Sequence, residues 1–115
     1  MSVARRPTAY MADCIETEVL PGVVRTTLAY IDEAMVCHFR LKKGTDIPSH
    51  NHAAVQAGYV ISGKIHFIRG NGDEFIAEPG CGYAFSPDET HGACILEDTE
   101  VIEFFTPSRS EYIDG

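Results

Sequence analysis

The sequence predicts an all-β domain, built as a small sandwich or barrel of antiparallel strands. Short runs of β-forming residues follow one another at close spacing, and turns containing glycine or proline separate them. No segment keeps a 3.6-residue hydrophobic period over three turns, which argues against long helices. The chain of 115 residues is long enough for one hydrophobic core. We therefore expect residues 1–115 to form a single domain.

The first half of the chain contains three predicted strands. Residues 1–9 lack periodicity and are expected to form a loose arm or an exchanged strand. Two runs of β-formers, Ile15–Leu20 and Val23–Tyr30, are separated by the turn pair Pro21-Gly22. The segment Met35–Lys42 alternates between apolar and mainly polar residues, so one face should be buried and the other can carry ionic groups.

The second half contains the strongest hairpin signal, Gly70-Asn71-Gly72-Asp73. It should join a strand at Lys64–Arg69 to a returning strand at Glu74–Glu78. An earlier strand, Val55–Ser62, is expected to turn at Ser62-Gly63. Further strands are expected at Tyr83–Ser86, His91–Leu96 and Glu100–Thr106.

Composition and charge exclude several classes of function. The net charge of −8 argues against a nucleic acid or an anionic membrane as partner. No apolar run approaches the roughly 20 residues of a membrane span, and no apolar stretch follows the N-terminal arginine pair, so we expect no secretory signal. Four cysteines without a CxxC pair are expected to be free thiols in a reducing cytoplasm. They are Cys14, Cys37, Cys81 and Cys94.

The segment Gly44–Gly63 holds the main candidate for a functional site. It contains His50, His52 and Gln56, all at even positions, so an unbroken strand would place them on one face. Two imidazoles and an amide oxygen directed at one volume suggest a divalent transition metal. His91, further along the chain, is a fourth candidate ligand. The alternative is that these histidines cap loops or line a polar barrel mouth.

The spacing of these residues resembles the first motif of the cupin superfamily. It reads Gly44-x5-His50-x-His52-x3-Gln56-x6-Gly63. Gln56 stands where an acidic ligand is usual. The segment from Gly82 to His91 resembles the second cupin motif more loosely, because Ile95 occupies the position of its customary asparagine.

The resemblance implies a small antiparallel double-stranded β-helix, the jelly-roll barrel, usually as a homodimer. It also implies that His50, His52, Gln56 and His91 bind one divalent transition metal, which could be Fe, Mn, Ni, Zn or Cu. Four neutral donors would leave such an ion its full positive charge. The ion would then be a stronger Lewis acid and would attract anionic ligands, so we expect a small anionic substrate.

Glu103 is the candidate catalytic acid or base. It shares one face of its predicted strand with Val101 and Phe105. If this face lines the barrel, burial would raise the pKa of Glu103 toward that of a general acid or base. Alternatively, Glu103 faces solvent and its apolar neighbours form a dimer contact.

The resemblance extends to small cupins of pectin degradation, which open unsaturated uronate rings. These have an acidic residue followed by an aromatic on the last strand, and they end in a segment similar to FTPSRSEYI, here Phe105–Ile113. The likeness implies an isomerase or lyase acting on a sugar-acid-like compound, with Glu103 as acid or base and Phe105 near the substrate. An iron or manganese dioxygenase and a non-catalytic binding protein are the alternatives.

Two further residues, His38 and Arg40, share the polar face of their predicted strand. If that face lines the pocket, Arg40 could bind a substrate carboxylate through two parallel hydrogen bonds. A surface salt bridge with one of the 17 acidic residues is the alternative. Tyr83 is expected to pack in the barrel, and Arg109 is expected to be solvated.

Overall fold

The computed structural model describes residues 5–113. It contains eight strands and two short 3-10 helices within these residues, which confirms the predicted all-β fold. No helix in this range is long and apolar enough to cross a membrane. The elements, in chain order, are η1 (Met11–Asp13), β1 (Glu16–Leu20), β2 (Val23–Tyr30), β3 (Met35–Leu41), β4 (Asp46–His50), β5 (Val55–Arg69), β6 (Glu74–Ala77), β7 (Gly82–Phe85), β8 (His91–Thr106) and η2 (Ser110–Tyr112).

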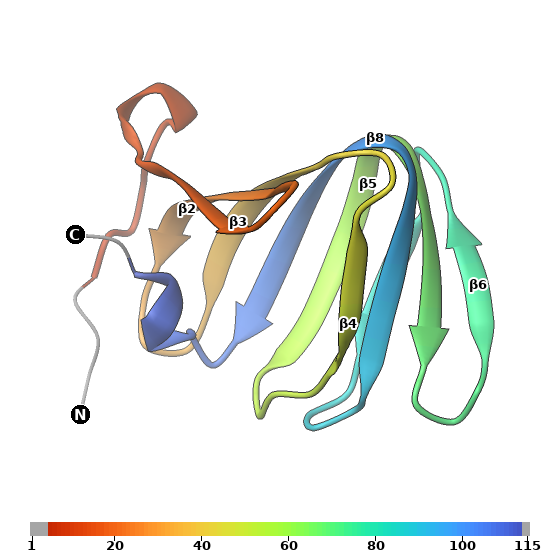
Figure 1. The fold of residues 1–115 in the computed structure, drawn as a ribbon. Helices are drawn as coiled ribbons and strands as arrows, with labels where there is room; N and C mark the ends of the chain where they lie inside the picture. The colour runs from red at the N-terminus through yellow and green to blue at the C-terminus, as the bar shows by residue number, and fades with distance from the viewer. Residues whose placement is uncertain (1–4, 114–115) are drawn as a thin grey trace.

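The long strands β5 and β8 pair with each other along most of their length and form the middle of the sheet. The first half of β5 also pairs with β7, and its second half pairs with β6. In the same way, β8 pairs with β4 through its first half and with β3 through its second half. The sheet therefore folds into two layers that face each other across the core, which is the jelly-roll arrangement (Figure 1).

The sheet passes from one layer to the other where β5 and β8 bend together. Gly63 has a φ of +96°, and a Cβ added there would lie 2.2 Å from Thr99 Oγ1. The pairing register shifts on both sides of this glycine. Such β-bulges bend a strand without ending it. The turn expected at Ser62-Gly63 is therefore a bend within β5, and the two strands expected over residues 91–106 are one strand, β8.

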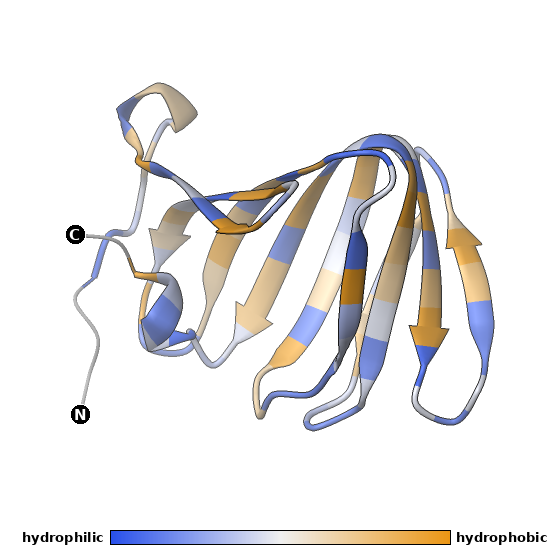
Figure 2. Ribbon diagram, in the orientation of Figure 1, coloured by the Kyte–Doolittle hydropathy of each residue, from blue (hydrophilic) through white to orange (hydrophobic). Residues whose placement is uncertain are grey.

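Alternation of side chains sets the inner and outer faces, as the hydropathy pattern of each strand shows (Figure 2). On β3, the apolar residues at odd positions from Met35 to Leu41 are all buried, as predicted. The inner face of β8 carries Val101, Glu103 and Phe105, each less than 9% exposed. Glu103 therefore faces the core rather than solvent.

The N-terminal segment lies against its own chain where the structure describes it. Arg6 forms an isolated antiparallel bridge with Tyr30, and its guanidinium donates to the Leu28 and Thr27 carbonyls at 2.9 and 2.6 Å. Residues 1–4 of the predicted arm lie outside the described residues. The four cysteines are free thiols, as predicted; Cys37 is buried and the other three are partly exposed.

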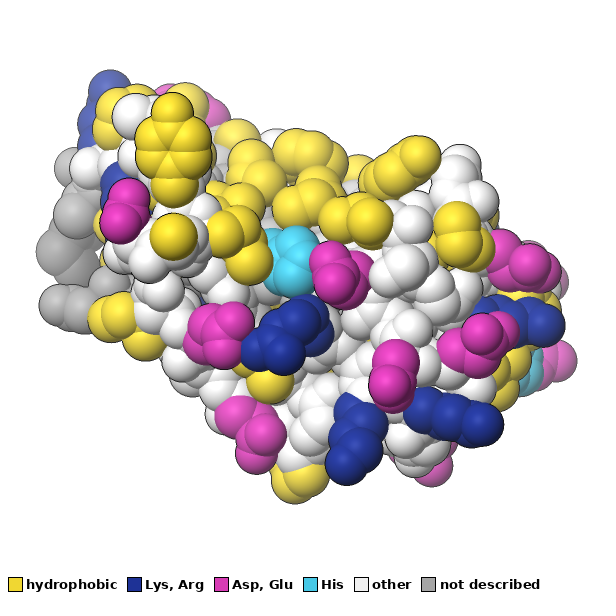
Figure 3. Space-filling model, turned by 90° about the horizontal axis from the view of Figure 1, so that it is seen from above, with side chains coloured by type: hydrophobic (Ala, Val, Ile, Leu, Met, Phe, Trp, Pro, Cys, Tyr) yellow, Lys and Arg dark blue, Asp and Glu magenta, His cyan; other side chains and the backbone are white. Residues whose placement is uncertain are grey.

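The outer face of β5 and of the end of β8 carries three exposed apolar side chains. Tyr59, Ile61 and Phe104 are 49%, 46% and 44% exposed. Phe104 pairs with Ala57, and Tyr59 and Ile61 follow Ala57 at alternate positions of β5. The three exposed side chains therefore lie on the same outer face. Figure 3 shows hydrophobic side chains gathered along one edge of the molecule seen from above. Apolar surface of this kind typically marks an interaction site.

Candidate metal centre

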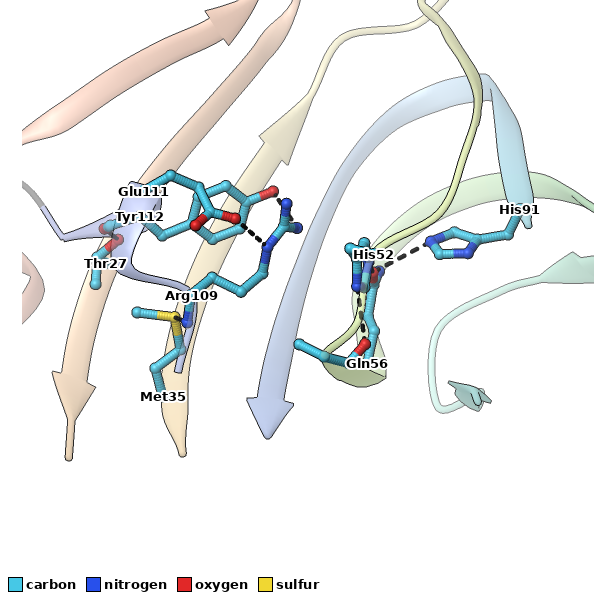
Figure 4. Close-up of polar contacts among 9 residues, drawn as sticks. Thr27, Met35, His52, Gln56, His91, Arg109, Glu111 and Tyr112 are labelled. Atoms are coloured by element: carbon cyan, nitrogen blue, oxygen red, sulfur yellow. Dashed lines mark hydrogen bonds and ion pairs between the residues drawn. The ribbon is translucent and has the colours of Figure 1, made fainter. Parts of the chain in front are cut away.

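Four predicted ligands come together at one end of the sheet. His50 ends β4, His91 begins β8, and these two residues are paired across the strands. His52 lies in the loop after β4, and Gln56 is on β5. An unbroken strand through residues 50–56 does not form, because β4 ends at His50 and β5 begins at Val55. The residues converge because the loop crosses from β4 to β5 and turns His52 back toward Gln56 (Figure 4).

Each histidine is oriented by a backbone carbonyl. The Nδ1 atoms of His50, His52 and His91 lie 2.9, 2.8 and 2.8 Å from the carbonyl oxygens of residues 48, 54 and 89. A carbonyl only accepts, so each Nδ1 carries a proton, and in the neutral form of such a ring Nε2 has the lone pair. One ligand atom from each ring lies within 4.8 Å of the others. This is the arrangement of imidazoles that bind a metal through Nε2.

Gln56 presents a fourth lone pair to the same point. Its Oε1 lies 2.9 Å from His52 Nε2 and 3.2 Å from His91 Nε2, while its Nε2 donates to Glu103 at 2.7 Å. Burial and the adjacent imidazoles lower the pKa of His91, so its ring is neutral at pH 7. The His91 nitrogen and the Gln56 oxygen are then two acceptors face to face. Such a contact is unfavourable unless a cation lies between them, so the donors fit a divalent transition-metal ion.

Gln56 directs its oxygen at the histidines and donates its amide to Glu103, and this double role can be tested in the metal-free protein. In Gln56→Glu, a carboxylate would replace the amide that donates to Glu103. We expect this change to reduce the free energy of unfolding by about 1–3 kcal/mol, measured by denaturation with chelator present. The double variant Gln56→Glu/Glu103→Gln restores one donor between the two side chains and should recover most of the loss. Simple addition of the two single effects would contradict this account.

One carboxylate oxygen of Glu103, Oε2, accepts two hydrogen bonds. Tyr83 OH donates to Glu103 Oε2 at 2.6 Å, and the Gln56 amide donates to the same oxygen at 2.7 Å. Burial raises the pKa of Glu103, although both hydrogen bonds oppose the rise. Burial and the neighbouring carboxyl raise the pKa of Tyr83 well above its usual value. Glu103 lines the cavity beside the metal centre, and Oε1 is the oxygen that remains for a bound molecule.

A glycine makes the contact between Tyr83 and Glu103 possible. Gly58 on β5 lies between the two residues, since it pairs with Tyr83 of β7 on one side and with Glu103 of β8 on the other. A Cβ at this position would come within 2.4 Å of the Tyr83 hydroxyl oxygen. The tyrosine therefore reaches across β5 only because residue 58 has no side chain. Sequence reasoning assigned Tyr83 to packing and missed this role.

The loop before His91 is fixed by an ion pair. Glu89 Oε2 accepts from Arg69 Nε at 2.6 Å, and Glu89 Oε1 accepts from the Ser86 amide at 2.9 Å. The Arg69 bond lowers the pKa of Glu89. Phe85 stacks on the His91 ring with the centroids 4.2 Å apart. The ion pair fixes the loop that leads to His91, and the Phe85 ring covers one face of the His91 imidazole.

We expect Glu89→Ala to weaken metal binding by about 10- to 100-fold, because groups that orient a ligand commonly contribute that much. Titration of the chelator-treated protein with Zn²⁺ would measure the affinity. Glu74→Ala is a matched control, since Glu74 pairs with His66 at 2.8 Å and lies apart from the ligand set. Equal affinities in both variants would show that Glu89 does not support the site.

An arginine that the sequence reading left in solvent lies close to Glu103 and the aromatic residues. The guanidinium of Arg109 is stacked on Tyr112 and Phe105, at 4.2 and 5.4 Å from the ring centroids. Arg109 also donates to the Tyr112 hydroxyl at 2.8 Å (Figure 4). Its charge acts to lower the pKa of Glu103. The side chain is only 16% exposed.

His38 and Arg40 do not reach the site. Both lie on the outer face of β3, because the apolar odd positions occupy the inner face. His38 Nε2 lies 3.1 Å from Glu100, and Arg40 pairs with Glu16 at 2.8 Å. Arg40 therefore forms a surface salt bridge, which was the alternative, and does not bind a substrate carboxylate in the cavity. Phe105, the third predicted substrate contact, lines the cavity.

Together, the fold and the site define a jelly-roll protein in which three histidines form a possible metal site. The model of the cupin domain family matches residues 37–106, and the chain belongs to this family. No curated protein matches the sequence.

Solved structures share the fold over nearly the whole chain. An RmlC-like cupin from Shewanella frigidimarina NCIMB 400 has a TM-score of 0.87 at 22% identity, covering 94% of this chain and 96% of that one. KdgF from Halomonas sp. has a TM-score of 0.85 at 26% identity, covering 92% and 99%. Hydroxypropylphosphonic acid epoxidase from S. wedmorenis has a TM-score of 0.76 at 14% identity, covering 84% and 57%.

Proposed function

We propose that this cupin is a metal-dependent isomerase or lyase that acts on a small anionic carbonyl compound, and the resemblance to the pectin-degradation cupins makes a sugar acid one candidate. One observation carries the proposal. The buried carboxyl group of Glu103 is hydrogen-bonded to Gln56, whose oxygen belongs to the candidate ligand set, and it faces the same cavity. A proton-transfer group and a metal centre then act on one substrate. The likeness to KdgF supports this class.

The residues have distinct roles in this proposal. His50, His52, Gln56 and His91 would hold one divalent transition-metal ion, which supplies Lewis-acid polarisation of a substrate oxygen. Glu103 Oε1 accepts a proton from the carbon next to the carbonyl group, and the C–H electron pair moves into the carbonyl system. Returning the proton to another atom completes an isomerisation, and expelling a leaving group completes an elimination.

Two neighbours keep Glu103 ready for this exchange. Tyr83 and Gln56 fix Oε2, so Oε1 keeps one direction toward the cavity. Burial raises the pKa of the carboxyl group, which makes it a stronger base once it is ionised. Arg109, which is paired with Glu111 at 2.8 Å, stacks on Phe105 and Tyr112, and its charge opposes the rise in the pKa of this group.

Deuterium exchange tests the proposed proton transfer without knowledge of the natural substrate. The metal-loaded protein is incubated in D₂O with pyruvate, and NMR follows deuterium at the carbon next to the carbonyl. A parallel reaction follows the loss of unsaturated galacturonate. We expect exchange that stops in Glu103→Gln. Oxygen uptake without exchange would indicate a dioxygenase, and tight binding with unchanged ligand would indicate a non-catalytic binding protein.

A homodimer through the apolar outer face is part of the proposal. We expect Phe104→Lys to convert dimers to monomers in sedimentation experiments, because a charge in the centre of a buried apolar patch is costly. Leu96→Lys is the matched control, since Leu96 is also on β8 and is 39% exposed. A monomeric wild-type protein, or equal behaviour of both variants, would contradict this interface.

A further inference from the structure

A cavity of about 370 Å³ adjoins the candidate metal centre, and its polar groups gather at one end. Three of these groups are His50, Gln56 and His91, whose polar atoms converge. The others are contiguous with them, since Gln56 bonds Glu103 and Glu103 bonds Tyr83. Tyr112 is the remaining polar residue, and its hydroxyl accepts a bond from Arg109. Among the described residues that line the cavity, none is Ser, Thr, Asn, Asp, Lys or Arg.

The rest of the cavity wall is aliphatic and aromatic. Each of the long inner strands contributes, with Phe39 and Leu41 from β3, Ile65 and Phe67 from β5, and Ile95 and Val101 from β8. All six of these side chains are less than 9% exposed. The molecule therefore encloses an apolar chamber that is continuous with the polar end.

Apolar residues also line the part of the cavity beside β1 and β4. Val19 and Leu20 of β1 and Ile47 and Pro48 of β4 line this part. Leu20 is 43% exposed, whereas Val19 and Ile47 are partly buried against the core. The side of the cavity beside β1 and β4 is therefore apolar, whereas its histidine end includes the exposed His50.

This distribution of polar groups selects the chemistry of a ligand. A compound with several hydroxyl groups would lose its bonds to water in the chamber and would find no donor or acceptor on the walls. An apolar group would gain from the same transfer. Burying one aromatic ring is worth about 10- to 100-fold in affinity. A cavity of about 150 Å³ can hold benzene, so a cavity of about 370 Å³ has room for a ring and a short polar head.

We propose that the substrate is an amphiphilic anion, in which a carboxylate and a carbonyl group form the head and an aromatic ring or a branched aliphatic chain forms the body. The head lies at the metal centre beside Glu103, and the body fills the apolar chamber. The assignment of the head rests on the proposed function. The assignment of the body rests on the chamber alone, and it favours an apolar acid over a sugar acid.

Binding of three small acids to the metal-loaded protein tests this inference by calorimetry. The probes are phenylpyruvate, pyruvate, which has the same head without the ring, and galacturonate, which has hydroxyl groups in place of an apolar body. We expect phenylpyruvate to bind at least about 10-fold more tightly than pyruvate, and galacturonate to bind no more tightly than pyruvate. Galacturonate that binds as tightly as phenylpyruvate would overturn the proposal.

A variant that fills the chamber gives an independent test. Ala93 lines the cavity and is 5% exposed, so Ala93→Leu should remove the preference for phenylpyruvate while pyruvate binding and metal content persist. Ala93→Val serves if the leucine variant does not fold by circular dichroism, and Leu96→Ala on the outside of the same strand is the control. Equal weakening of both acids in the chamber variants would contradict the assignment of the body.

The two proposals fail in different ways. Preference for phenylpyruvate without Glu103-dependent deuterium exchange would leave the chamber assignment intact and overturn the proton transfer. Glu103-dependent exchange on pyruvate without tighter binding of phenylpyruvate would support the proton transfer and overturn the chamber assignment.

Discussion

Purified His50→Ala protein should contain almost no transition metal, whereas the wild-type protein should contain about one ion per chain. The variant removes one of three imidazoles whose ligand atoms lie within 4.8 Å of one another. Changing a group that merely orients a ligand commonly costs about 10- to 100-fold in metal affinity, so losing a ligand should cost at least about 100-fold. Elemental analysis of protein purified without chelator measures this directly and identifies the metal.

Two histidines outside the site provide matched controls for this experiment. His38 pairs with Glu100 and His66 pairs with Glu74, each through Nε2. Neither residue lines the cavity beside the metal centre. Their alanine variants should keep the metal content of the wild type. Metal that persists in His50→Ala, or that disappears equally in the controls, would show that the converging side chains do not form the binding site.

The strand pattern and the face that Glu103 shares with Val101 and Phe105 were predictable because they depend on local alternation, whereas the direction of that face was left open. Apolar residues at every second position of β3 specify which face enters the core. The same alternation around Glu103 placed its carboxyl group between Val101 and Phe105, and the structure buries all three. Interior carboxyl groups are costly, so a single one in an apolar pattern is a strong signal of function.

Contacts across strands were not predictable in the same way. Tyr83 meets Glu103 only because the register places Gly58 between β7 and β8, and register depends on pairing partners that are distant in the chain. Arg109 follows the last strand and folds back over Phe105, which no periodicity predicts.

The assignment of Arg40 to the pocket was wrong for a related reason. A strand with one continuous polar face turns that face outward when the barrel interior is apolar. Polar groups that belong to the site enter the interior singly, as Glu103 does among apolar neighbours. The number of ionic residues on a face is therefore a weaker guide to the site than one ionic residue on an apolar face.

Glu103→Gln should reduce the rate of proton transfer by about 10²- to 10⁴-fold, the usual contribution of a general acid or base. The shape of the site should survive, because both existing hydrogen bonds go to one oxygen, Oε2. The amide oxygen of the variant can accept the same bonds from Tyr83 and Gln56. Metal content and thermal unfolding should therefore stay close to those of the wild type, which separates a chemical role from a structural one.

Glu100→Gln is the matched control, since it makes the same substitution on the outer side of β8, where Glu100 pairs with His38. It should retain full exchange activity. Full activity of Glu103→Gln would contradict the assignment of Glu103 as the acid or base, whereas loss of metal together with activity would mean that the carboxyl group acts mainly by holding Gln56. The two outcomes differ because the rate of deuterium exchange reports the proton transfer, and the metal content reports the position of the amide oxygen.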